Sequence, residues 1–136
     1  MNREDIKCLI ENYLKEVDDV LRSARPFDGI LGLGKRPADN PCHGIFIDNV
    51  GKAVAEVKDS EEAFAVADEL IRANENYDCS MMTSLSMTAA QGHILKLLPL
   101  LTSEQKKELK VYFDKHIPKR KRLPVQEELY RALKQN

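Results

Sequence analysis

Apolar residues near the N-terminus recur every three or four positions, the spacing that places side chains on one face of an α-helix. The stripe comprises Ile6, Leu9, Ile10, Tyr13, Leu14, Val17 and Leu21. Asn2 stands where a helix is capped, and Arg25-Pro26 should end the helix, because proline disfavours helical geometry in the residue before it. The pattern predicts a helix over residues 3–23.

A connection that contains glycine and proline follows, from residue 24 to residue 40. Connections of this length are uncommon in compact domains, and they are usually binding loops, packed surface loops or disordered segments. Apolar residues within it argue against disorder: Phe27, Ile30, Leu31 and Leu33. We expect the connection to lie on the core.

Residues 41–57 fit two structures. A helix that starts with Asn40 as its cap and Pro41 in its first turn would gather apolar side chains on one face: Phe46, Ile47, Val50, Ala53, Val54 and Val57. Gly44 and Gly51 oppose a helix, since each costs about 1 kcal/mol relative to alanine in a helix interior. The alternative is a small β-hairpin at about 45–57 that turns near Gly51. The helix is the favoured interpretation.

Later segments carry helix patterns together with helix start signals. The predicted helices run over about 60–75, over about 79–98, from Thr102 to the residue before Pro118, and from Pro124 onward. We therefore predict an all-α fold, a bundle of five or six helices in a single domain over residues 1–136. An α+β fold with one hairpin is the alternative.

Composition places this domain inside the cell. Hydrophobic residues make up 43% of the chain and charged residues 32%, which are ordinary proportions for a globular protein. The N-terminus lacks the apolar stretch of a secretory signal, and the low-charge segment over residues 79–95 holds His93 and several hydroxyl groups, so we predict no membrane span. Three cysteines form no even disulfide set, which is typical of a reducing compartment. We expect a cytoplasmic protein.

Charge is distributed unevenly along the chain. Residues 1–80 hold 10 Lys and Arg against 17 Asp and Glu, a net charge of −7, whereas residues 81–136 hold 11 against 5, a net charge of +6. Much of the excess lies in a basic cluster of six residues: Lys115, His116, Lys119, Arg120, Lys121 and Arg122. Around a turn fixed by two prolines, these groups can bind phosphates or an acidic protein surface. No aromatic residue is interleaved for base stacking, and the acidic half of the chain is a competing partner.

The connection also contains a glycine pattern with a basic end, whose members are Gly29, Gly32, Gly34, Lys35 and Arg36. Gly29 to Lys35 has the G-x-x-x-x-G-K spacing of a loop that cradles phosphates. Arg36 stands where such a loop needs a hydroxyl group to bind the metal, and a helix rather than a strand precedes the pattern. We interpret the segment as a turn with a basic tip that serves as a contact surface, not as a nucleotide-hydrolysing site.

Four residues are of types that bind metals: Cys42, His43, Cys79 and His93. Adjacent Cys42 and His43 would point in different directions on a helix, and no C-x-x-C or H-x-x-x-H spacing supports a preorganised site. A buried thiol commonly behaves as a small hydrophobe. We predict no metal and no cofactor, and no set of residues forms a convincing catalytic constellation.

Several amphipathic helices in 136 residues present more apolar surface than one small core covers. Contact with a protein partner, or symmetric contact with a second copy, would bury the surplus. We therefore predict a protein-interaction or regulatory module that self-associates as a homo-oligomer rather than an enzyme. Two alternatives stay open, a nucleic-acid-associated protein that binds through residues 115–122 and a helical domain that binds a small molecule or a metal.

Overall fold

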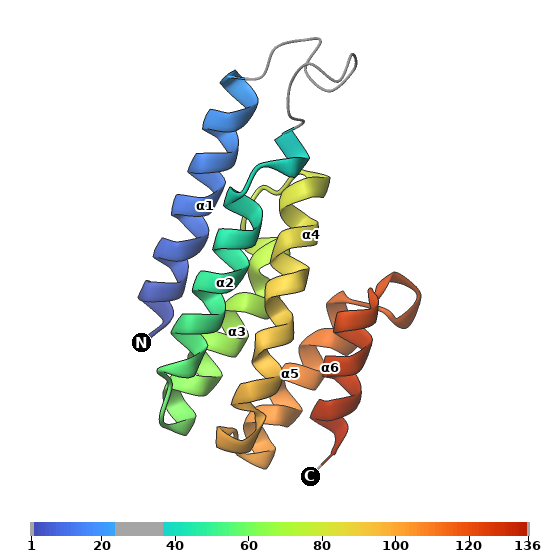
Figure 1. Ribbon diagram of the computed structural model, residues 1–136. Coiled ribbons are helices and arrows are strands. Elements are labelled where there is room, and N and C mark those ends of the chain that lie inside the picture. The colour runs from blue at the N-terminus through green and yellow to red at the C-terminus, as the bar shows by residue number, and fades with distance from the viewer. Residues whose placement is uncertain (1, 24–36, 136) are drawn as a thin grey trace.

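The computed structural model describes residues 2–23 and 37–135, and this part of the chain forms helices and no β-strand (Figure 1). The α-helices are α1 (Arg3–Ser23), α2 (Cys42–Ala55), α3 (Ser60–Asn76), α4 (Met81–Ala90), α5 (Ser103–His116) and α6 (Pro124–Lys134). The 3₁₀ segments are η1 (Pro37–Asp39), η2 (Gln91–Leu100) and η3 (Lys119–Lys121). The predicted all-α fold is confirmed.

Side chains cap the first turns of α1 and α5 at the residues that the sequence predicts. The Asn2 side chain accepts a hydrogen bond from the Asp5 backbone N–H at 3.1 Å, at the start of α1. At α5, Thr102 and Gln105 form a reciprocal capping box, which satisfies two backbone donors that the helix leaves open. These local bonds fix where the helices begin.

Residues 41–57 contain helix α2, so the hairpin alternative is wrong. The N-cap residue is Pro41 rather than the expected Asn40, although the Asn40 side chain accepts a hydrogen bond from the Cys42 backbone N–H at 3.0 Å. Gly44 has open space where a side chain would stand. Burial of one apolar face, which includes Phe46 and Val50, outweighs the helix cost of the glycines.

Gly51 has a packing role in α2. A Cβ atom at this position would lie 2.7 Å from Cε1 of His93, which comes from η2. The His93 ring donates from Nε2 to the backbone oxygen of Ile47 at 3.0 Å. The missing side chain therefore allows α2 and η2 to approach closely.

The predicted helix over 79–98 is corrected by the structure, because α4 ends at Ala90 and the chain continues as the 3₁₀ segment η2. Its buried residues are Gln91, Ile94 and Leu97, which follow one another at every third position. A 3₁₀ helix has three residues per turn, so this spacing keeps all three side chains on the core side.

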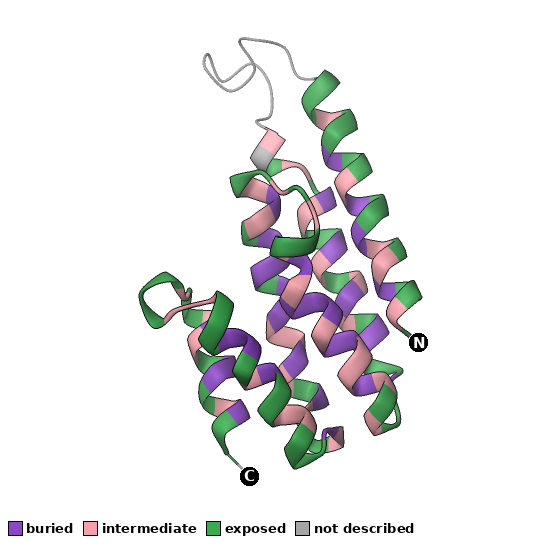
Figure 2. Ribbon diagram, turned by 180° about the vertical axis from the view of Figure 1, so that it is seen from behind, coloured by how far each residue is buried: buried purple, intermediate pink, exposed green. Residues whose placement is uncertain are grey.

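The helices form a bundle with a hairpin attached to it. Helices α1, α2, α3 and α4 pack beside one another, while α5 and α6 pair as a hairpin and α6 packs on η2 (Figure 1). The buried residues face inward from all six α-helices, and the turn between α5 and α6 is exposed (Figure 2). Buried Gln91 donates to the Leu70 backbone oxygen at 3.1 Å and accepts from Gln126 at 3.4 Å. This polar chain ties the hairpin to η2 and α3.

Candidate functional site

The turn between α5 and α6 presents three consecutive cations to solvent. These are Lys119, Arg120 and Lys121, which form η3 and are all exposed. Pro118 precedes the segment and Pro124 begins α6, so the turn is conformationally restricted at both ends. We call Lys119–Lys121 the basic turn.

Arg122 belongs to the same cluster in sequence but lies inward. Its side chain is only 5% exposed, and its guanidinium carbon stands 3.8 Å from the centre of the Tyr130 ring. The guanidinium donates to the Ile117 backbone oxygen at 2.8 Å and pairs with Glu127 at 3.4 Å and with Asp114 at 3.9 Å. Arg122 therefore holds the turn in place rather than offering its charge to a ligand.

The other end of the basic cluster lies against α3. The His116 ring stacks on Tyr112 with 4.5 Å between ring centres, and its Nδ1 lies 3.4 Å from a carboxylate oxygen of Glu75. The Tyr112 hydroxyl donates to the other oxygen of the same carboxylate. Burial raises the pKa of Tyr112 well above its usual value, and the hydrogen bond to Glu75 raises it further. The phenol is therefore a hydrogen-bond donor and not a base at neutral pH.

A second arginine lies over the ring of Tyr112. The Arg72 guanidinium carbon stands 4.4 Å from the ring centre, and its Nε pairs with Asp68 at 2.7 Å. Asp68 also accepts from Arg3 at 2.9 Å, so α1 joins the same network. The Arg72 side chain is 43% exposed, which leaves part of its guanidinium open to solvent.

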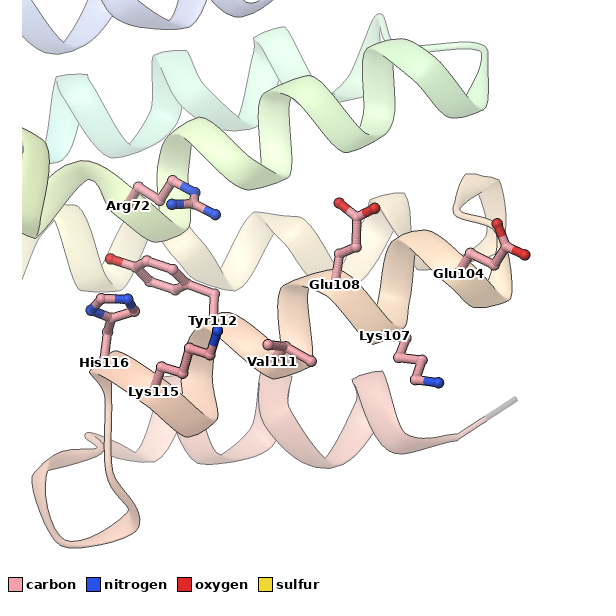
Figure 3. Close-up of a pocket in the computed structure, with 8 residues that line it drawn as sticks. All are labelled: Arg72, Glu104, Lys107, Glu108, Val111, Tyr112, Lys115 and His116. Atoms are coloured by element: carbon pink, nitrogen blue, oxygen red, sulfur yellow. The ribbon is translucent and has the colours of Figure 1, made fainter.

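Two cavities meet at Tyr112 and His116. One, which we call the α5 cleft, has a volume of about 690 Å³ and runs along one side of α5, with Arg72 contributed by α3 (Figure 3). The other, the hairpin notch, has a volume of about 420 Å³ and lies between α3, α4 and the α5–α6 hairpin. Ser84 and Thr88 of α4, together with Lys121, are among the residues that line the notch. The basic cluster thus borders both cavities.

Helix α4 carries exposed apolar side chains beside the notch. Met81 is 82% exposed and Leu85 is 53% exposed, and they lie one helical turn apart. Leu123, which is 39% exposed, lines the notch from the opposite side. Helix α4 therefore carries two exposed apolar side chains in addition to Ser84 and Thr88, which line the notch.

The sequence-predicted contact residues of the glycine-containing connection lie outside the described residues: Gly29, Gly32, Gly34, Lys35 and Arg36. The connection as a whole was expected to lie on the core, and its residues 24–36 also fall outside the described part.

The four metal-type residues do not assemble as one site. His93 is engaged with α2, and His43 donates from Nε2 to the Pro37 backbone oxygen at 3.0 Å while its Nδ1 accepts from the Tyr13 hydroxyl at 2.7 Å. Burial raises the pKa of Tyr13, so its hydroxyl is a hydrogen-bond donor. Within residues 2–23 and 37–135, no group of three or more His, Cys, Asp or Glu side chains is arranged to hold a metal ion.

Sequence reasoning missed Arg72, Glu75 and Tyr112 as members of the site. The sequence did contain a sign of the ion-pair network that includes Arg72. Glu69 falls on the apolar stripe of α3 between Val66 and Ala73, and it is 2% exposed. A carboxylate at a buried position requires cationic or hydrogen-bonding partners. Arg3 and Tyr77 provide these, at 3.2 Å each.

Comparison with known protein families, with curated proteins and with solved structures finds no significant match to this chain. Among the helices that the structure describes, none combines the length and apolar character needed to cross a bilayer.

Proposed function

We propose that this chain is a protein-interaction module that binds a partner helix at the hairpin notch. The observation that carries the proposal is the pair of exposed apolar residues on α4, Met81 and Leu85. The same helix contributes Ser84 and Thr88 to a notch that is also lined by Lys121. Exposed apolar surface with a polar rim is typical of protein contact sites. Methionine also adapts its shape to a partner at little cost.

The chemistry of the notch favours an amphipathic partner with acidic side chains. Its apolar residues would cover Met81, Leu85 and Leu123, as in other complexes where a helix lies in a groove. Its carboxylates would lie near Lys119, Arg120 and Lys121, which are exposed and make no ion pair among the described residues. Because Arg122 already fixes the turn, the turn loses little conformational freedom when these cations bind a partner.

Site-specific photo-crosslinking in cells that produce the protein tests this proposal. A photoreactive phenylalanine analogue at Leu85 should yield a covalent adduct with another protein, whereas the same analogue at Asp48, which is exposed on α2, should not. Replacing all three residues of the basic turn with serine should weaken the adduct. No adduct at Leu85, or equal adducts at both positions, would contradict the proposal.

Polyanion binding through the basic turn is a second candidate, favoured by the three exposed cations on a rigid turn. Three phosphate contacts predict that the logarithm of the binding constant for DNA falls with the logarithm of salt concentration with a slope of about −3. Fluorescence anisotropy with labelled DNA measures this slope. If binding is unchanged after all three residues are replaced with serine, this candidate is excluded.

A further inference from the structure

The exposed side of α5 that forms the α5 cleft carries an ordered pattern of charge. Its residues recur every three or four positions and so share one face of the helix. They are Glu104, Lys107, Glu108, Val111, Tyr112, Lys115 and His116, and Figure 3 shows them along the cleft. Only Arg72 of α3 reaches this cleft from another helix, so the face is not covered by the described part of the chain.

Apart from His116, which lies beside Glu75, the charged groups on this face have no ion-pair partner within the described residues. Glu104, Glu108 and Lys115 are exposed and form no ion pair there. Elsewhere on the same helix, Lys110 and Asp114 pair with each other at 3.2 Å. Of the charged residues of α5 that form no ion pair within the described part of the chain, all but Lys106 line the cleft.

The order of these residues makes the face complementary to itself. The two acidic residues come first, the apolar Val111 stands in the middle with 40% of its surface exposed, and Lys115 follows. In an antiparallel pair of helices, the N-terminal half of one lies against the C-terminal half of the other. Opposite charges then meet at both ends, with Val111 of each copy between them.

We infer that two copies of this chain associate through antiparallel contact of their α5 faces, with Glu108 of each copy beside Lys115 of the other. A two-fold axis near Val111 and Tyr112 relates the copies, so each contact occurs twice. Val111 supplies the exposed apolar contact near this axis, while Tyr112 is only 5% exposed and is fixed by its contacts with Arg72 and His116. This association uses a different surface from the hairpin notch, and it does not depend on the proposed partner.

Lys107 is the exception to the pattern, since it lies at the acidic end of the face. In the antiparallel arrangement it lies near the basic end of the second copy, where it opposes association. Lys107→Glu should therefore strengthen the dimer, an effect opposite in sign to that of the other charge reversals.

Sedimentation equilibrium of the full chain from about 1 µM to about 1 mM tests the inference, because it covers weak as well as moderate association. Wild type should reach a mass of two chains in this range. Glu108→Lys and Lys115→Glu should each weaken the dimer by about tenfold, since each turns two attractive contacts into repulsive ones. The double variant should recover wild-type affinity. Glu128→Lys, at an exposed position on α6, is the matched control and should have no effect.

A monomeric wild type at about 1 mM would overturn the inference. So would single variants that dimerise like wild type, or a double variant no better than the singles. Circular dichroism spectra of all variants should match that of wild type, because the altered side chains are exposed. The photo-crosslink at Leu85 should persist in Lys115→Glu, which separates failure of this dimer from failure of the proposed partner site.

Discussion

Arg72 and Arg122 each place a guanidinium group over a tyrosine ring, but in opposite surroundings. Arg122 lies in a closed corner of the hairpin, 5% exposed, between Tyr130 and carboxylates of α5 and α6. Arg72 lies at the open α5 cleft, 43% exposed, with Asp68 as its ion-pair partner. The same pairing of residue types therefore stabilises the fold in one place and shapes a surface in the other.

The difference shows what decides the role of a cation. Excluding water strengthens the electrostatic interactions of a guanidinium group and makes any lost partner costly, whereas solvent screens an exposed one. Arg122 satisfies its donors internally, so it is unavailable to a ligand although it adjoins the basic turn. Burial, and not position in the basic cluster, separates structural from accessible charge.

The largest effect is expected at the closed corner. Arg122→Lys keeps the charge but loses the planar fork and the contact over Tyr130, and should lower the free energy of unfolding by about 2–3 kcal/mol. Urea denaturation measures the change. Arg120→Lys, two positions away on the exposed turn, is the control and should stay within about 0.5 kcal/mol of wild type. Equal losses of stability at the two positions would contradict the distinction between buried and exposed cations.

Two glycines of α2 also differ in their surroundings, since Gly51 faces the His93 ring and Gly44 faces open space. Gly51→Ala places a methyl group against His93 and should destabilise the protein by about 1–2 kcal/mol despite the helix preference of alanine. Gly44→Ala meets open space and should stabilise it by about 0.5–1 kcal/mol. Thermal and urea unfolding of both variants check the two signs. A stabilising Gly51→Ala would show that His93 moves aside freely.

A smaller effect is expected at the open cleft. Arg72→Ala removes a partly exposed ion pair and the contact over Tyr112, and should cost about 0.5–1 kcal/mol. Asp68 keeps Arg3 as its partner, which limits the loss. If urea unfolding shows that Arg72→Ala lowers the free energy of unfolding as much as Arg122→Lys does, solvent exposure does not govern the energies of the two arginine–tyrosine contacts.

The smallest effect concerns acid sensitivity of the closed corner. The Tyr130 hydroxyl donates to Asp114, and with Lys110 and Arg122 it lowers the pKa of that carboxyl below its usual 3.8. A depressed pKa adds stability at neutral pH, and this stability is lost as pH falls below about 4 and through the folded-state value. The difference in urea midpoint between wild type and Asp114→Asn should be constant from pH 7 to about pH 5 and shrink at lower pH. A difference that does not change with pH would contradict this assignment.

Local sequence patterns predicted most of the helices because their causes are local. The first helix was expected over residues 3–23 and is α1 (Arg3–Ser23), and Thr102 with Gln105 forms the expected capping box. The 3₁₀ form of η2 was missed, although the spacing of three between Gln91, Ile94 and Leu97 was present in the sequence. That spacing also fits an amphipathic α-helix, and only contacts with α2, α3 and α6 distinguish the two.

The sequence by itself determined that this chain forms amphipathic helices, where they are capped, and that the second half carries an excess of positive charge. Only the tertiary structure decided which cations are buried, that α3 supplies Arg72 and Glu75 to α5, and that Gly51 receives His93. Periodicity and capping act over a few neighbouring residues, so they can be read along the chain. Burial of a charge depends on helices distant in sequence, and it becomes defined only when those helices pack.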